Sequence, residues 1–129
     1  MARSIIHPGE NSDIYRRFGY APAVSAGGFL FISGQVGILP DGSAPTDPEE
    51  EIRQAFTNMG HILSAAGASF DDVVDLTVFY TNYPEHTALG RAVRDEVFGT
   101  ATPPNWTSVG VAALSPPFIF EAKAIALLP

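Results

Sequence analysis

A chain of 129 residues, with 46% hydrophobic and 16% charged residues, is long and apolar enough to build the core of one domain. Its formal net charge of −7 disfavours binding to nucleic-acid backbones and to anionic membranes, and the absence of cysteine excludes disulfides, thiolate chemistry and cysteine-bound metals. No segment matches a secretory signal peptide or a membrane span. We therefore expect a single domain over residues 1–129 of a soluble, cytoplasmic protein.

The N-terminal part is predicted to form strands around a tight hairpin. Residues 4–7 suit a short strand that ends at a Pro-Gly turn, and the polar residues 10–17 are predicted to be irregular. Two further strand segments, 23–26 and 29–33, flank Gly27-Gly28. This pair suits a two-residue turn because glycine accepts positive φ at little cost.

Signals at both ends indicate a helix over residues 48–66. Asp47 is predicted as the N-cap, Pro48 as the first helical residue and Glu50 as the second half of a capping box. Gly67 is predicted to end the helix. Between these signals the apolar residues recur on one helical face, which should cover a sheet.

The second half of the chain returns to strands. Branched and aromatic residues predict a strand over 73–80, and a second helix is predicted from Asn82 to Gly99. Two closing strands follow, over 103–109 and 118–128, joined by a proline-containing loop. The order β-β-β-α-β-α-β-β predicts an α+β fold with one mixed, six-stranded sheet and both helices on one face.

The last strand has two different faces. Its even positions carry Phe, Ala and Leu, which suit packing under helices, while its odd positions carry three apolar residues together with Glu121 and Lys123. An apolar second face of this kind is typical of an interface. We expect a symmetric homo-oligomer with this face turned inward.

Three parts of the chain resemble the reactive intermediate deaminase family, also called RidA/YjgF. The first part joins Tyr20-Ala21-Pro22-Ala23-Val24 to Phe31-Ile32-Ser33-Gly34-Gln35. The second joins residues 53–58 and 65–67 to 72–79, and the third is the segment 121–126. Together they extend the resemblance over nearly the whole chain.

This resemblance implies a chorismate-mutase-like α+β domain that assembles as a homotrimer with three clefts between subunits. In the deaminating members, an arginine on the penultimate strand holds the substrate carboxylate, and a glutamate on the last strand positions the water that hydrolyses a 2-imino acid. The resemblance implies that Glu121 is that glutamate and that Tyr20 and Gly34 belong to the same cleft. Counting back without a gap from Glu121 places Trp106 at the arginine position.

Trp106 is the most informative departure from the family pattern. An indole offers one donor and no charge, whereas an arginine binds a carboxylate with two parallel hydrogen bonds. Losing a charged hydrogen bond of this kind typically costs about 1.5–3 kcal/mol. Two other positions also depart from the family pattern. Gly90 stands where the family often has an asparagine in the second helix, and Lys123 stands where the last strand usually has a second acid.

The candidate site residues also have simpler interpretations. Glu121 is the candidate catalytic group, but it could instead form a structural pair with Lys123. Trp106 and Ser108 share a face of their strand and are candidate substrate-binding residues, although Trp106 could equally anchor an interface.

The N-terminal candidates are open in the same way. Tyr20 could offer its phenol to a ligand or stand exposed in a loop, and Gly34 could admit a ligand to the backbone or mark a β-bulge. Arg16 or Arg17 could reach the cleft and replace the missing cation, although a charged pair in a polar loop is usually solvated. The three histidines show no ligand spacing and no phosphate-binding loop is present, so we expect neither a metal nor a cofactor.

Two functions remain open from the sequence. The first is a hydrolase or deaminase-like enzyme acting on a small imine, enamine or related metabolite, with Glu121 orienting water. The second is a metabolite-binding or regulatory trimer that keeps the cleft without the chemistry. RNA cleavage, which is attached to the family by name, is disfavoured by the acidic charge and by the lack of a histidine acid/base pair.

Overall fold

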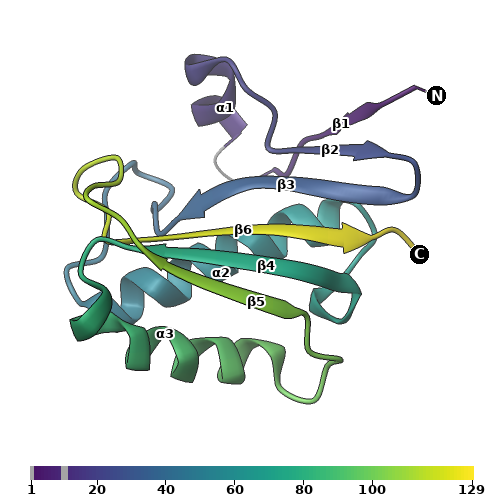
Figure 1. Cartoon of the computed structure of the whole chain (residues 1–129). Coiled ribbons are helices and arrows are strands. Elements are labelled where there is room, and N and C mark those ends of the chain that lie inside the picture. Colours follow the sequence, from purple (N-terminus) through teal and green to yellow (C-terminus); the bar gives the residue numbers. More distant parts are fainter. Residues whose placement is uncertain (1, 10–11) are drawn as a thin grey trace.

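Six strands form one mixed sheet in the computed structural model, which describes residues 2–9 and 12–129 (Figure 1). The strand order is β1-β2-β3-β6-β4-β5, in which β4 and β5 run parallel and the other neighbours run antiparallel. The strands are β1 (Ser4–Ile6), β2 (Ala23–Ala26), β3 (Phe29–Val36), β4 (Val73–Tyr80), β5 (Asn105–Gly110) and β6 (Phe120–Leu127). The predicted α+β class and mixed six-stranded sheet are confirmed.

Helices α2 (Pro48–Ala65) and α3 (Tyr83–Phe98) lie on one side of this sheet, as predicted (Figure 1). The apolar face predicted for α2 is buried and joins the core with the even positions of β6. Ala122, Ala124 and Ala126 are fully buried there, and their small side chains allow the helix to approach the sheet closely. We call this side of the sheet the helix face.

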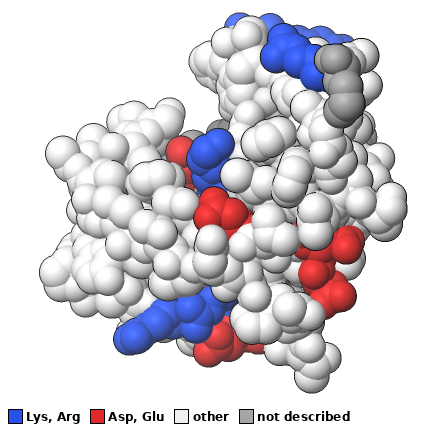
Figure 2. All heavy atoms as spheres, turned by 45° about the vertical axis from the view of Figure 1, so that its right-hand side comes forward, with Lys and Arg blue, Asp and Glu red and all other residues white. Residues whose placement is uncertain are grey.

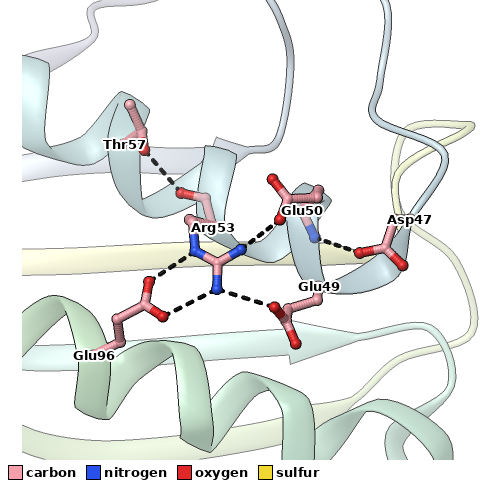
Figure 3. A network of polar contacts seen from close by, with 6 residues as sticks. All are labelled: Asp47, Glu49, Glu50, Arg53, Thr57 and Glu96. Atoms are coloured by element: carbon pink, nitrogen blue, oxygen red, sulfur yellow. Dashed lines mark hydrogen bonds and ion pairs between the residues drawn. The ribbon is translucent and has the colours of Figure 1, made fainter.

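The ends of α2 form largely as predicted. The Asp47 carboxylate accepts a hydrogen bond from the Glu50 N–H at 3.1 Å, and Gly67 has φ +76° just beyond the helix. The capping-box role of Glu50 was wrong, because its carboxylate instead accepts a bond from Arg53 at 2.6 Å. Arg53 also donates to Glu96 of α3 at 2.7 Å, so this partly exposed network links the two helices (Figure 3).

The N-terminal segment departs from the prediction. Ser12–Phe18 forms a short helix, α1, where an irregular segment was expected, and residues 10–11 of that segment lie outside the described residues. One side chain anchors this helix: Tyr15 is only 8% exposed and its hydroxyl donates to Gln35 Oε1 at 3.0 Å. A single anchor produces no apolar period, so the sequence pattern gave no sign of the helix. The Gly27-Gly28 turn is confirmed, with both residues at positive φ.

The side of the sheet away from α2 and α3 has no helical cover from them, and we call it the open face. Phe29, Phe31 and Leu127 are 41%, 42% and 47% exposed on it, and the strand register pairs Phe29 with Leu127 and Phe31 with Ile125. Figure 2 shows a surface on which charged side chains are few and scattered among uncharged residues. The predicted apolar second face is therefore present in the chain.

Candidate functional site

One half of the site lies at a break in the regular pairing of β3. The pairing between β3 and β6 shifts register between Ile32 and Gln35, as a β-bulge does. Ser33 is held there by two bonds, from its N–H to the Pro22 carbonyl at 3.0 Å and from its hydroxyl to the Ala21 carbonyl at 2.7 Å. These observations support the interpretation of Gly34 as part of a β-bulge. The hydrogen bonds of Ser33 fix the backbone next to Gly34.

The Glu121 carboxylate lies directly over this bulge. A Cβ added to Gly34 would meet Glu121 Oε2 and would lie 2.8 Å from Glu121 Cδ, so the carboxylate occupies the space that a side chain at this position would take. Within the described residues, the Glu121 carboxylate forms no hydrogen bond or ion pair, and Lys123, on the same face of β6, is exposed to solvent. A Glu121–Lys123 pair is therefore not formed within one chain. Burial raises the pKa of the Glu121 carboxyl above its usual range.

Tyr20 completes this part of the site. Burial and, next, the negative charge of Glu121 raise the pKa of the Tyr20 phenol, which places the two side chains within electrostatic reach. The Tyr20 ring also packs edge-on against Tyr15, with ring centres 5.2 Å apart. Because Tyr15 donates to Gln35, whose amide donates to the Ser33 carbonyl at 3.0 Å, the aromatic pair is tied to the bulge. We call Tyr20, Gly34 and Glu121 the acid half-site.

Two hollows border the acid half-site. Tyr20 and Gly34 line a small one of about 50 Å³ together with Asn58 and His61. Tyr20 also lines an open hollow of about 550 Å³, together with Arg3, His7 and Arg16. Of the two arginines considered as replacement cations, Arg16 borders this hollow, and it is largely exposed in a 3.5 Å pair with Asp13. Arg17 lines a different hollow beside Asp41.

Trp106 and Ser108 lie on the other side of the sheet. The parallel register pairs Trp106 with Leu76 and Ser108 with Val78, and both partners are fully buried on the helix face. The two residues share a face, as predicted, but one chain does not bring them together with Glu121. The intervening positions of β5 are Asn105, Thr107 and Val109, so β5 carries no arginine on either face.

A cation that the sequence interpretation missed lies against Trp106. The Arg94 guanidinium of α3 is 4.5 Å from the centre of the indole ring. Both residues line a hollow of about 380 Å³ whose other walls include Phe98, Pro103 and Pro104. Arg94 follows Gly90 by one helical turn, so the only available signal was its position on the helix that precedes β5. We call Arg94, Trp106 and Ser108 the aromatic half-site.

Two buried hydroxyls lie near the aromatic half-site. Gly90 leaves room for the Tyr80 phenol, because a Cβ there would lie 2.7 Å from Tyr80 Cζ. Tyr80 Oη and Ser108 Oγ are buried without a well-formed hydrogen bond to any described residue, although Ser108 is near enough to lower the pKa of the Tyr83 phenol. Burial raises the pKa of Tyr80 to about 12, so this hydroxyl stays protonated and can donate.

The remaining titratable residues add no metal site. The described part of the chain contains no group of three or more His, Asp or Glu arranged to hold a metal ion. His86, which sequence interpretation treated only as one of three scattered histidines, is 7% exposed and lines a hollow with Glu51 and Glu85. None of the described helices is long and apolar enough to cross a bilayer.

Known proteins share both the sequence pattern and the fold. Residues 11–128 match the family model described as Endoribonuclease L-PSP, and the chain is 39% identical over 129 residues to RutC family protein YjgH of Escherichia coli strain K12. That alignment covers 100% of this chain and 98% of YjgH. The chain belongs to the RidA/YjgF family. The family resemblance found in the sequence is thus confirmed.

Two solved structures and one further sequence relative are also similar to this chain. The solved structure of YjgH superposes with a TM-score of 0.92 at 38% identity, covering 100% of this chain and 98% of that one. The crystal structure of E. coli TdcF with bound serine gives a TM-score of 0.83 at 31% identity, covering 96% and 98%. A 2-iminobutanoate/2-iminopropanoate deaminase of Dermatophagoides farinae is 32% identical over 111 residues, covering 84% of this chain and 85% of the relative.

Proposed function

We propose that this RidA/YjgF protein is a deaminase-like hydrolase that acts on a small imine or enamine in clefts between the subunits of a homotrimer. The observation that carries the proposal is the Glu121 carboxylate, which is partly buried, lacks any partner in the described chain and lies over a glycine bulge. A carboxylate without a structural partner is available to bind water and to accept a proton. The name of the D. farinae relative supports a deaminase reaction.

The reaction follows from simple chemistry. Water bound to Glu121 attacks the carbon of a C=N bond while the carboxylate accepts one of its protons. That proton passes to the nitrogen to give a carbinolamine. The carboxylate then moves the hydroxyl proton of the carbinolamine to the nitrogen as the C–N bond breaks, so that ammonia leaves and the carbon becomes a carbonyl. One water is consumed and one ammonia is released, so no cofactor or redox partner is required. The raised pKa of Glu121 suits both proton transfers.

The positions of the two half-sites support clefts between subunits. The acid half-site lies by the open face and the aromatic half-site lies on the helix face, so a cleft that contains both needs two copies of the chain. When one surface of a subunit meets a different surface of the next, the contacts form a closed ring if the rotation between subunits returns to the start, as in a trimer. The exposed apolar residues Phe29, Phe31 and Leu127 supply a surface for such contacts. We therefore propose the homotrimer, which light scattering can test; a monomer would contradict it.

The test couples the protein to an amino-acid oxidase that generates 2-imino acids from several amino acids. The expected result is faster release of the keto acid with the wild-type protein, loss of this acceleration in Glu121→Gln, and no loss in the matched surface variant Glu85→Gln. If the wild-type protein accelerates none of these reactions and Trp106→Arg does not create activity, the deaminase proposal is wrong.

The lack of an arginine on β5 favours a second candidate, a metabolite-binding or regulatory trimer without the chemistry. A thermal-shift screen of keto acids, enamines and aromatic metabolites separates the two candidates when it is combined with the coupled assay. A ligand that raises the melting temperature of the wild-type protein but not of Glu121→Ala, without any turnover, would favour the binding protein. Flat melting curves for every compound would count against both candidates.

A further inference from the structure

The stacking of Arg94 on Trp106 fixes a positive charge beside β5. The guanidinium lies 4.5 Å from the ring centre, within the range of a cation–π contact, and the Arg94 side chain is only 26% exposed. A stacked guanidinium keeps its plane fixed and its edge free to form two parallel hydrogen bonds. Trp106 stands where the family pattern has an arginine, but its indole holds a different arginine, Arg94, in place.

The existing partner of Arg94 leaves most of its hydrogen-bonding capacity unused. Nε and Nη2 donate to the same atom, Asp95 Oδ1, at 3.0 and 2.8 Å, and no other described residue accepts a bond from Arg94. Asp95 is the next residue on the helix and its side chain is 70% exposed. Pairs this exposed contribute little, so a ligand carboxylate can share or replace Asp95.

The surroundings of Arg94 also suit the rest of a small ligand. The hollow of about 380 Å³ has apolar walls from Phe98, Pro103, Pro104 and Trp106, and the Asp95 partner of Arg94 also lines it. The fully buried Tyr80 hydroxyl lacks a well-formed bond, and the positive charge of Arg94 reaches it, partly offsetting the effect of burial on its pKa. One charged donor thus lies beside an apolar wall, which is the composition of a site for an anion with a hydrocarbon body.

We propose that Arg94, held by Trp106, binds the carboxylate of the ligand, and that the hollow beside it selects ligands with a branched or aromatic side chain. This inference rests on the proposed function in that it assigns the substrate class of the same cleft: 2-imino acids, or their keto-acid products, with bulky apolar side chains. Arg94 is then a specificity-determining residue that α3 supplies where β5 has no arginine. Trp106 positions it.

Trp106 is the only tryptophan of the chain, so its fluorescence reports directly on this site. The experiment titrates the full-length protein with 4-methyl-2-oxopentanoate and, as an uncharged match, with 4-methylpentan-2-one. We expect a saturable fluorescence change with the carboxylate and a much weaker one with the ketone. Arg94→Gln should weaken carboxylate binding by about tenfold to 100-fold, the loss typical of a charged hydrogen bond.

Three variants sharpen the test. Arg91→Gln removes an exposed arginine from the same helix and should leave the affinity unchanged, which controls for net charge. Arg94→Lys keeps the charge but loses the planar stack, so its affinity should fall between wild type and Arg94→Gln. Asp95→Asn releases Arg94 from its present partner and should tighten binding. Melting temperatures confirm that each variant folds. If Arg94→Gln does not fold, the comparison of Arg94→Lys with the wild type still tests the role of Arg94.

The outcomes separate this inference from the proposed reaction. Equal binding by wild type and Arg94→Gln, equal binding of the carboxylate and the ketone, or no carboxylate binding at all would overturn the role of Arg94. If the coupled assay shows turnover and Arg94→Gln leaves the KM for 2-imino acids unchanged, the reaction stands and the inference fails. If no variant turns over substrate but binding still depends on Arg94, the inference stands and the proposed reaction fails.

Discussion

Glu51 and Glu121 are both acids withdrawn from solvent, on opposite sides of the sheet, but their surroundings differ. Glu51 is 4% exposed on α2, and its Oε2 accepts a bond from the Ile119 N–H at 2.7 Å. Burial raises its pKa against the opposing effect of backbone bonds from Ile119 and Phe120. Burial alone raises the pKa of Glu121, which no described residue binds. Glu51 thus holds the backbone in place, whereas the Glu121 carboxylate has no such structural partner and is available for the proposed chemistry.

Each of the two acids also has a glycine beside it. A Cβ at Gly37 would meet the Glu51 carbonyl oxygen and would lie 3.0 Å from its carbonyl carbon, so the obstacle is backbone. A Cβ at Gly34 would meet only the side chain of Glu121. Gly37 therefore permits close packing of two backbone segments, while Gly34 makes room for a movable carboxylate.

The largest expected effect is on activity. Glu121→Gln keeps the shape of the side chain but cannot accept a proton, so the rate in the coupled assay should fall by about 10²–10⁴-fold, the usual size of a general acid–base contribution. Glu51→Gln serves as the internal control and should change the rate by less than about threefold, within ordinary context effects. Equal losses from the two substitutions would contradict the distinction between the two acids.

The two glycines should differ next most strongly. Gly37→Ala forces two backbone segments apart and should lower the free energy of unfolding by about 2–3 kcal/mol, as overpacking does. Gly34→Ala can be relieved by rotation of the Glu121 side chain, so it should cost less than about 1 kcal/mol while abolishing most activity. Urea unfolding at a fixed protein concentration measures the first effect, and the coupled assay measures the second. A stable, fully active Gly34→Ala protein would show that the carboxylate need not lie over the bulge.

A smaller effect is expected from the partner of Glu51. Glu51→Ala leaves the partly buried Ile119 N–H without this acceptor and should destabilise the fold by about 1–3 kcal/mol. Glu51→Gln retains a carbonyl oxygen for this bond and should cost less than about 1 kcal/mol. Urea unfolding of both variants provides the comparison. Similar losses would mean that the negative charge of Glu51, beside the buried His86, matters more than the hydrogen bond.

The sequence was a good guide wherever local chemistry decides the structure. The cap at Asp47, the glycines after both long helices and the alternation along β6 place the elements and the buried face, because each depends on neighbouring residues only. The convergence of Tyr20, Gly34 and Glu121 was implied by the family resemblance, and the structure places these residues together.

The rest of the site depends on long-range register. The alternation on β5 shows that Trp106 and Ser108 share a face, but which face lies opposite Glu121 depends on the loop over residues 111–119 and on pairing with β4. Arg94 reads in sequence as a solvated charge on an amphipathic helix, and only the packing of α3 below the sheet brings it to Trp106. Short patterns carry no information on these contacts.

The smallest expected effect is the pH dependence of stability that Glu121 creates. Because burial raises its pKa in the folded chain above the unfolded value, protonation favours folding; this contribution is fully present below the unfolded pKa and is lost as the pH rises through the folded pKa. Glu121→Gln removes the group, so its melting temperature should exceed that of the wild type at pH 7, by no more than about 3 °C, and the gap should close near pH 4. Glu85→Gln, on the exposed start of α3, controls for the loss of one negative charge. A wild-type protein that instead melted above Glu121→Gln at pH 7, with the difference vanishing toward acid pH, would mean that Glu121 gains a favourable partner in the assembled protein, which would remove the main contrast with Glu51.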